Sequence, residues 1–345
     1  MPDTVIQLSH GGGGGATAQL IQSVFTSRLG NRYLRRQEDA AVFSITDLWS
    51  GMSHSKSDLL QHEHLALTTD SFVISPLFFP GGDIGRLAIS GTVNDLLMMG
   101  ARPRYLTAGF ILEEGLLIAD LERIVDSMAQ VAAQTGIELV AADTKVVEGK
   151  GGMMINTTGL GVVDCQNPLG ADQARPGDAI LVSGPLGDHQ ACIMSQRMGV
   201  HNAILSDVTP LHRPVRALLD QGLPVHCLRD ITRGGLATVL NELVQSSDCG
   251  AELDEAAIPV HHETQALCAV LGLDPLNMAN EGKFVAIVAQ EAATAALNSL
   301  NQFPESAGAI QIGQITSDKG IVLRTQIGGR RLLTTPWYEG LPRIC

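Results

Sequence analysis

The feature that most constrains the fold of this chain is a break in composition near its middle. Residues 164–178 contain two prolines and two glycines among polar residues, a pattern typical of a junction between folded units. With 345 residues the chain is too long for one ordinary hydrophobic core and suits two domains of roughly 150 to 200 residues each. We therefore predict an N-terminal domain over residues 1–165, a C-terminal domain over residues 170–335 and a flexible tail over residues 336–345.

Strand-like and helix-like segments follow one another in both halves. Expected strands of the first half lie at 5–8, 65–75, 104–112, 137–142 and 153–163, and expected helices at 16–29, 84–99 and 118–136. Expected strands of the second half lie at 179–183, 251–253, 284–288, 310–315 and 321–324, and expected helices at 190–198, 210–221 and 236–246. Residues 228–235 are expected to form a loop that enters the last of these helices. This order predicts an α+β fold, with sheets layered against helices and a separate core in the second half.

Composition and charge argue against several classes of protein. Apolar residues make up 45% of the chain and aromatic residues only 4%, the profile of a soluble protein packed with aliphatic side chains. The formal net charge of -13 repels phosphate backbones, so nucleic acid is not expected as a partner. No apolar run approaches the roughly 20 residues of a membrane helix, and no secretory signal is visible at the N-terminus. We expect a cytoplasmic protein with no membrane partner.

The cysteines favour a thiol function at one position only. None of the six falls in a CxxC pair, so a zinc or iron–sulfur site is not expected. Five are expected to be small buried side chains: Cys165, Cys192, Cys227, Cys249 and Cys268. The sixth, Cys345, is the last residue, on a tail of about ten residues that can extend about 33 Å. Such a thiol can visit more than one site, although by position alone a frayed terminus is the simpler interpretation.

Three glycine-rich segments are candidate phosphate-binding loops. They lie at 11–15, 184–187 and 234–235. Glycines let backbone N–H groups approach phosphate oxygens, and a following helix adds its positive N-terminal end. None matches the P-loop or the dinucleotide-binding pattern, and for residues 11–15 a flexible turn is the alternative interpretation.

Four aspartates form the stronger signal. Asp39, Asp70, Asp95 and Asp143 each lie at or near the end of an apolar segment. Gathered at one cleft, they could hold Mg²⁺ against a triphosphate, because Mg²⁺ prefers oxygen ligands. For any single aspartate, a helix cap or a turn is the alternative interpretation.

Other polar residues are candidates for acid–base or phosphate chemistry. Lys145 lies two residues after Asp143, so on an extended segment both side chains point the same way and the lysine could hold a phosphoryl group. Glu281 precedes a strand and is a candidate general base. His10 and His189 lie beside glycines and could bind phosphate or move protons, although an ordinary hydrogen-bonded histidine is the alternative.

Taken together, these segments resemble the HypE family of NiFe hydrogenase maturation factors, the carbamoyl dehydratases of the aminoimidazole ribonucleotide synthetase (PurM)-like superfamily. The segments that carry the resemblance are 9–14 (SHGGGG), 69–71 (TDS), 80–82 (PGG), 91–95 (GTVND), 109–115 (GFILEEG), 143–147 (DTKVV), 187–189 (GDH), 229–235 (RDITRGG), 280–283 (NEGK) and 342–345 (PRIC). The resemblance covers essentially the whole chain.

The resemblance implies a two-domain PurM-like fold that binds ATP with Mg²⁺ in the cleft between domains. It also implies a homodimer in which the N-terminal sheets close a β-barrel, with an α/β sandwich as the C-terminal domain. The nucleotide-binding residues that it implies are His10, Gly11, Gly12, Asp70, Asn94, Asp95, Asp143, Asp188, His189 and Asp230. The implied Mg²⁺ ligands are Asp39, Asp70, Asp95 and Asp143.

The implied activity takes place on the chain's own last residue. A partner carbamoyltransferase, HypF, places a carbamoyl group on the Cys345 sulfur, and ATP-dependent dehydration converts the thiocarboxamide to a thiocyanate. The cyanide then passes to iron on a HypC–HypD scaffold. Lys145 and Glu281 are the implied catalytic residues beside Cys345. Two alternatives stay open: a small-molecule ATP enzyme of the same superfamily, such as a cyclo-ligase or kinase, and a non-catalytic thiol carrier.

Overall fold

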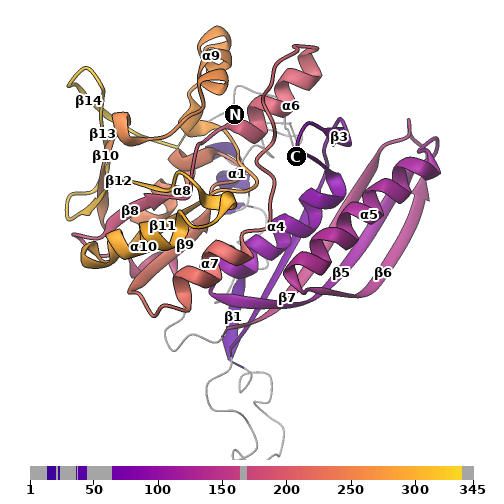
Figure 1. The fold of residues 1–345 in the computed structure, drawn as a ribbon, viewed down its shortest axis with the longest axis horizontal. Coiled ribbons are helices and arrows are strands. Elements are labelled where there is room, and N and C mark those ends of the chain that lie inside the picture. Colours follow the sequence, from indigo (N-terminus) through magenta and orange to yellow (C-terminus); the bar gives the residue numbers. More distant parts are fainter. Residues whose placement is uncertain are drawn as a thin grey trace, which may run out of the picture.

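The computed structural model describes residues 14–20, 22–23, 36, 38–44, 64–163 and 169–335, and these form two sheet-containing halves (Figure 1). Helix α1 spans Gly15–Leu20, within the helix expected at 16–29, most of which lies outside the described residues. The strand expected at 5–8 and the tail at 336–345 lie outside them too. No helix among the described residues is both long and apolar enough to cross a membrane.

The N-terminal half is built on a mixed five-stranded sheet. Its strand order is β1-β2-β7-β5-β6, in which β5 and β6 are parallel and the other pairs are antiparallel. The strands are β1 (Ala41–Ser44), β2 (His64–Phe72), β5 (Ala101–Glu113), β6 (Glu138–Val147) and β7 (Met153–Val163). A small hairpin of β3 (Phe78–Phe79) and β4 (Gly82–Asp83) lies outside this sheet. The sheet therefore has β6 at one edge.

Two helices lie side by side on one face of this sheet (Figure 1). They are α4 (Ile84–Met98) and α5 (Ile118–Thr135), both close to the expected ranges. Asp83 caps α4, because its Oδ1 accepts from the backbone N–H groups of Gly85 and Arg86 at 2.8 and 3.0 Å. A Cβ at Gly85 would clash with the backbone of Ile124, so this glycine permits the close packing of α4 on α5.

The C-terminal half contains a seven-stranded sheet with helices on both faces. Its strand order is β14-β13-β10-β12-β8-β11-β9. The strands are β8 (Ala179–Val182), β9 (Val225–Asp230), β10 (Gly250–Asp254), β11 (Phe284–Val288), β12 (Ile310–Thr316), β13 (Gly320–Arg324) and β14 (Arg330–Leu332). The helices are α6 (Asp188–Met198), α7 (His212–Leu219), α8 (Gly235–Ser246), α9 (His262–Leu271) and α10 (Ala293–Leu300).

The two halves share part of their hydrophobic core. One apolar cluster joins buried residues of α4, such as Leu97, to Leu181 of β8 and Val215 of α7. A second cluster packs Leu240 of α8 against Ile180 of β8, on the opposite face of the C-terminal sheet. Alternate residues of β8 thus serve the two clusters, as expected for a strand buried on both faces. The prediction of a separate core for the second half is right for one face of its sheet and wrong for the other.

Most expected elements are present, with three kinds of exception. Residues 228–230 belong to strand β9 rather than to a loop, so that prediction was wrong for its first three residues. Strand β6 continues through Val147, five residues beyond its expected end. The sequence reading also missed β1, β3, β4, β9, β14, α9 and α10. The domain boundaries at 165, 170 and 335 stay a prediction.

Candidate active site

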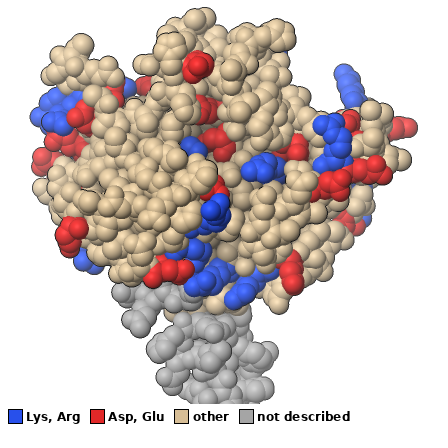
Figure 2. Space-filling view, viewed as in Figure 1, with Lys and Arg blue, Asp and Glu red and all other residues tan. Residues whose placement is uncertain are grey.

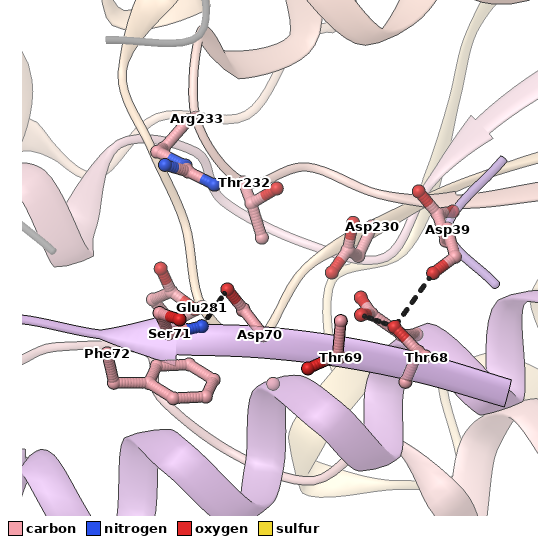
Figure 3. Close-up of a pocket in the computed structure, with 12 residues that line it drawn as sticks. Asp39, Thr68, Thr69, Asp70, Ser71, Phe72, Asp230, Thr232, Arg233 and Glu281 are labelled. Atoms are coloured by element: carbon pink, nitrogen blue, oxygen red, sulfur yellow. Dashed lines mark hydrogen bonds between the residues drawn. The ribbon is translucent and has the colours of Figure 1, made fainter. Parts of the chain in front are cut away.

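A polar pocket of about 230 Å³ lies where the two halves meet (Figure 3). On the N-terminal side its lining comes from the segment before β1, from β2 and from α4. On the C-terminal side it comes from the end of β9, the segment that follows β9 and the segment before β11. The lining residues are Asp39, Thr68, Thr69, Asp70, Ser71, Phe72, Gly91, Asp95, Asp230, Thr232, Arg233 and Glu281. Five carboxylates therefore share one small cavity.

One threonine hydroxyl lies within hydrogen-bond distance of two of these acidic residues. Thr68 Oγ1 lies 2.7 Å from Oδ2 of Asp95 and 3.1 Å from the backbone oxygen of Asp39. Figure 3 shows Asp230 between Asp39 and Asp70, and the β2 strand running beneath them. Asp70 faces α4, because its Oδ2 lies 4.0 Å from the position that a Cβ of Gly91 would occupy. Residues of two strands, β2 and β9, of helix α4 and of the segment before β1 thus converge.

Burial and mutual repulsion disfavour the charged forms of these carboxyls. Burial, and then the charge of Asp230, raises the pKa of Asp95 well above its usual value. Burial also raises the pKa of Asp39, against the opposing charge of Arg229. For Asp230, burial raises the pKa to about 6, with Arg229 opposing and Asp70 adding to the rise. A bound divalent cation would neutralise this repulsion, so the donor set fits Mg²⁺.

The carboxylates do not form a ready-made metal cage. Within the described part of the chain, no three His, Cys, Asp or Glu side chains are grouped as a metal centre. Mg²⁺ usually keeps several waters and binds one or two carboxylates together with substrate phosphates. The arrangement is therefore suited to a cation that arrives with a phosphorylated ligand, for which Asp39, Asp70 and Asp95 are the candidate holders.

A glycine pair beside the pocket fits the expectation of a phosphate-binding loop. Gly234 and Gly235 follow the lining residue Arg233 and begin the twelve-residue helix α8. Both have positive φ, at 77° and 63°, and a Cβ on Gly235 would lie 2.5 Å from the backbone oxygen of Leu276. Only glycine suits this close turn, which connects the pocket residue Arg233 to the first turn of α8.

Glu281 is held by a segment that contacts both halves. Its backbone N–H donates to Oδ1 of Asp207 at 2.9 Å, and its carbonyl accepts from the N–H of Thr209 at 3.4 Å. The carbonyl of Thr209 in turn accepts from the side-chain amide of Asn94, on α4, at 3.1 Å. Asn94 Oδ1 also accepts from the N–H of Leu211 at 2.8 Å. Glu281 is only 6% exposed, so its place in the pocket depends on contacts across the two halves.

Asp143 and Lys145 lie away from this pocket in the single chain. The sheet register aligns Asp143 with Gly109, Asn156 and Ser71, so three strand spacings of about 4.8 Å separate it from Ser71, about 14 Å in all. The side chains of Asp143 and Lys145 are 72% and 68% exposed. Three of the four predicted aspartates thus line the pocket, and the fourth, Asp143, lies elsewhere on the N-terminal sheet.

The remaining predicted residues have separate positions. His189 is fully buried, its Nδ1 lies 2.8 Å from Ser206 Oγ, and burial lowers its pKa to about 3. Asp188 accepts hydrogen bonds from His261 at 2.7 Å and from Thr264 at 2.6 Å. Neither residue lines the pocket. His10, Gly11, Gly12 and Cys345 lie outside the described residues.

Sequence reasoning assigned no role to several residues that line the pocket. Thr68 and Thr69 precede Asp70 on β2, and Thr232 and Arg233 follow Asp230. A signal was present for Thr68, because it lies two residues before Asp70 and therefore faces the same side of an extended strand. Its link to Asp95 depends on how α4 packs against β2, which the spacing does not give.

The family of this chain follows from comparison with known proteins. Residues 37–163 match the model of the N-terminal domain of AIR synthase related proteins, and residues 175–326 match the model of their C-terminal domain. Carbamoyl dehydratase HypE of Azotobacter vinelandii is 47% identical over 99% of this chain and 97% of its own length. The chain belongs to the HypE family of carbamoyl dehydratases. The HypE of Escherichia coli K12 is 44% identical over 99% of both chains.

Solved structures of HypE proteins have the same fold. A HypE in complex with ATP is 44% identical and superposes with a TM-score of 0.79 over 99% of this chain and 100% of that one. The HypE of a HypE–HypF complex is 41% identical and gives a TM-score of 0.83 over 92% of this chain and 99% of that one. An AaThiL structure with AMPPCP and TMP, only 20% identical with a TM-score of 0.68, shares the fold. The two-domain PurM-like α+β architecture is thereby established.

Proposed function

We propose that this HypE-family chain uses ATP to dehydrate a carbamoyl group carried on the sulfur of its own Cys345. The product is a thiocyanate, which supplies a cyanide ligand to the iron of a NiFe hydrogenase. Family membership identifies the chain as an ATP-dependent carbamoyl dehydratase. The acidic pocket between the halves is the observation that carries the proposal, because a phosphorylated cosubstrate with Mg²⁺ fits its donor set.

The reaction needs a better leaving group than a carboxamide oxygen. Transfer of the γ-phosphoryl group of ATP to that oxygen gives ADP and releases one N–H proton. Loss of phosphate and of the second N–H proton then leaves the S–C≡N group. Mg²⁺ would neutralise the triphosphate charge when bound. Glu281, at the pocket, is proposed to accept a proton, and Lys145 to stabilise the phosphoryl oxygens.

The other described cysteines are poorly suited to carry the carbamoyl group. Cys192, Cys227, Cys249 and Cys268 are free and at most 5% exposed. Burial raises the pKa of all four thiols, to about 12 for Cys227 and about 11 for Cys192 and Cys268. A thiolate is the reacting form, so these side chains are weak nucleophiles. These four thiols are therefore poor acceptors, and Cys165 lies outside the described residues. We propose Cys345 as the acceptor and the cytoplasm as the location.

The start of the tail lies within reach of the pocket. Leu333 is 3% exposed, and its carbonyl accepts from the side-chain amide of Asn241, on α8, at 3.1 Å. The N-terminal end of the same helix begins beside the pocket residue Arg233, six residues or about 9 Å from Asn241. The ten residues that follow Thr335 can extend about 33 Å, which is enough for Cys345 to enter the pocket.

We propose that a second copy of the chain completes the site. All ten residues of β6 are exposed, and this strand lies at the edge of the sheet that the described residues form. Four of them are large and apolar: Leu139, Val140, Val146 and Val147. An exposed apolar edge strand is a surface for pairing with another chain. A homodimer through this strand, closing a barrel, would bring Asp143 and Lys145 beside the partner.

Two further partners are part of the proposal. A HypF carbamoyltransferase would load Cys345, in line with the solved complex of a related HypE with HypF. A HypC–HypD complex carrying iron would accept the cyanide. Both require the loaded thiol to leave the pocket, which a terminal residue can do.

Mass spectrometry of the carbamoylated chain tests the proposal. With MgATP, the loaded protein is expected to lose one water, about 18 Da, whereas an ATP analogue that cannot transfer its γ-phosphoryl group leaves the mass unchanged. An unchanged mass with MgATP would rule out catalysis and leave a thiol carrier. A Cys345→Ala variant that keeps full ATP turnover would instead indicate a small-molecule substrate.

A further inference from the structure

A largely shielded arginine of the C-terminal half contacts one of the pocket carboxylates. Arg229, in β9, places Nε 2.6 Å from Oδ1 of Asp39, and its side chain is only 12% exposed. Its Nη2 donates to Oε2 of Glu242, on α8, at 2.9 Å. Glu242, Arg229 and Asp39 thus form a continuous chain of contacts that crosses from one half of the molecule to the other.

The two oxygens of Asp39 have different surroundings. Oδ1 is bound by Arg229, while Oδ2 is buried and has no hydrogen-bond partner among the described residues. The side chain is 9% exposed and lines the pocket. The backbone of the same residue is held by Thr68 Oγ1. Because a buried carboxylate oxygen without a partner is costly, this oxygen is suited to a ligand that arrives later.

We propose that Arg229, oriented by Glu242, is a positioning residue for Asp39. The arginine holds Oδ1 of Asp39, so that Oδ2 can bind the divalent cation of a bound nucleoside triphosphate. The proposal deepens the proposed function and rests on it. Arginine suits the role, because its planar guanidinium stays charged and binds two carboxylates in fixed directions. Loss of such an outer contact typically weakens metal binding by about 10–100-fold.

Charge and position predict opposite results when the arginine is removed. If Arg229 acts only through its charge, its removal makes the pocket more negative, and divalent cations bind more tightly. If it acts by holding Asp39 in place, its removal frees the carboxylate to turn, and the cations bind more weakly. The direction of the change therefore separates a positioning role from a purely electrostatic one.

The experiment measures Mn²⁺ affinity of the full chain with a non-hydrolysable ATP analogue, from the electron paramagnetic resonance signal of free Mn²⁺. Arg229→Met is expected to weaken Mn²⁺ binding by about tenfold or more, and Arg229→Lys by less. The matched control is Arg324→Met, because Arg324 also lies between two carboxylates, Glu252 and Asp254, but on β13 near the opposite edge of the sheet. Its Mn²⁺ affinity is expected to equal that of the wild type.

A variant of Glu242, the more exposed of the two carboxylates that contact Arg229, covers the case in which Arg229→Met does not fold. The side chain of Glu242 is 43% exposed, so Glu242→Asp is expected to fold. This variant keeps the negative charge but shortens the reach to Arg229, so a positioning role predicts that Mn²⁺ binding weakens by about threefold or more, whereas a purely electrostatic role predicts no change. Unchanged or tighter binding in the folded variants overturns the positioning role. If the wild type itself does not bind Mn²⁺ with the analogue, the proposed nucleotide site is wrong, which is a different outcome.

Discussion

Lys145 Nζ lies 2.8 Å from both carboxylate oxygens of Asp143. The two residues are two apart on the extended strand β6, so their side chains leave the same face, as the spacing predicted. The Lys145 contact lowers the pKa of Asp143, and both side chains are exposed. The pair is therefore already formed on the surface of one chain, at the edge where we propose that a second copy docks.

Mixing two inactive variants is expected to restore dehydration. Lys145→Ala and Glu281→Ala should each slow single-turnover water loss by about 10²–10⁴-fold, the usual range for a lost acid–base group. If one chain supplies Lys145 to the site that holds Glu281 of the other, a mixed dimer has one intact site. An equal mixture with free subunit exchange should then regain about a quarter of the wild-type sites. The measurement is the amplitude of water loss by mass spectrometry.

The control mixture contains Lys145→Ala and a double variant that carries both Lys145→Ala and Glu281→Ala. No mixed dimer then contains an intact site, so no recovery is expected. If the first mixture also fails to recover although its subunits exchange, each chain must use its own lysine. If both single variants turn over at the normal rate, Lys145 and Glu281 have no part in the mechanism.

The buried imidazole of His189 is expected to make the fold sensitive to acid. Its pKa is lowered to about 3, while an unfolded histidine has a pKa near 6.5. Between these values the unfolded state binds a proton that the folded state does not, so this residue reduces the free energy of unfolding as the pH falls below about 6.5. In His189→Asn, whose side chain can keep the bond to Ser206, the contribution disappears. Urea unfolding from pH 4 to pH 8 measures the difference in free energy of unfolding between the two proteins, which should change with pH below about 6.5 and become constant above about pH 7.

The sequence predicted this histidine as a candidate ligand, and the reason that it lies elsewhere is physical. A histidine beside a glycine loop has the same local sequence whether its ring faces a ligand or the interior. Here Phe79, from a segment more than a hundred residues earlier, packs its ring edge-on at 5.6 Å. Long-range packing of this kind is invisible in local spacing.

Other parts of the site follow directly from the sequence pattern. The helix over 84–99 and the strand over 153–163 were predicted within one residue, because their apolar periodicity is long and their ends carry glycine or a cap. The packing of α4 against β2 brings Asp95 and Asp70 to one pocket. The place of Asp143 could not be predicted, since it depends on which strands pair, and β6 lies three strands from β2.

Removal of residues 336–345 is expected to leave the fold intact. Leu333 is the last buried apolar side chain that the structure describes, and its backbone is bound to both Ile321 and Asn241. The truncated chain should unfold within about 0.5 kcal/mol of the full chain, as for a change away from the core. As a contrast, Leu333→Ala should cost about 2–3 kcal/mol, because it empties a buried site. A large fall in melting temperature on truncation would show that the tail belongs to the core.

Asp230→Asn is expected to stabilise the ligand-free fold and to impair nucleotide binding. Burial raises the pKa of Asp230 to about 6, above its unfolded value near 3.9, so the folded charged form is disfavoured. Protonation of Asp230 stabilises the folded state. This contribution is fully present below about pH 4 and is lost as the pH rises through about 6. Removing the charge should therefore add about 1–3 kcal/mol at pH 8 and little at pH 4. Thermal unfolding at both pH values measures the gain, with the exposed Asp318→Asn as control. MgATP should raise the melting temperature of the wild type more than that of the variant, and an equal rise in both would remove Asp230 from the site.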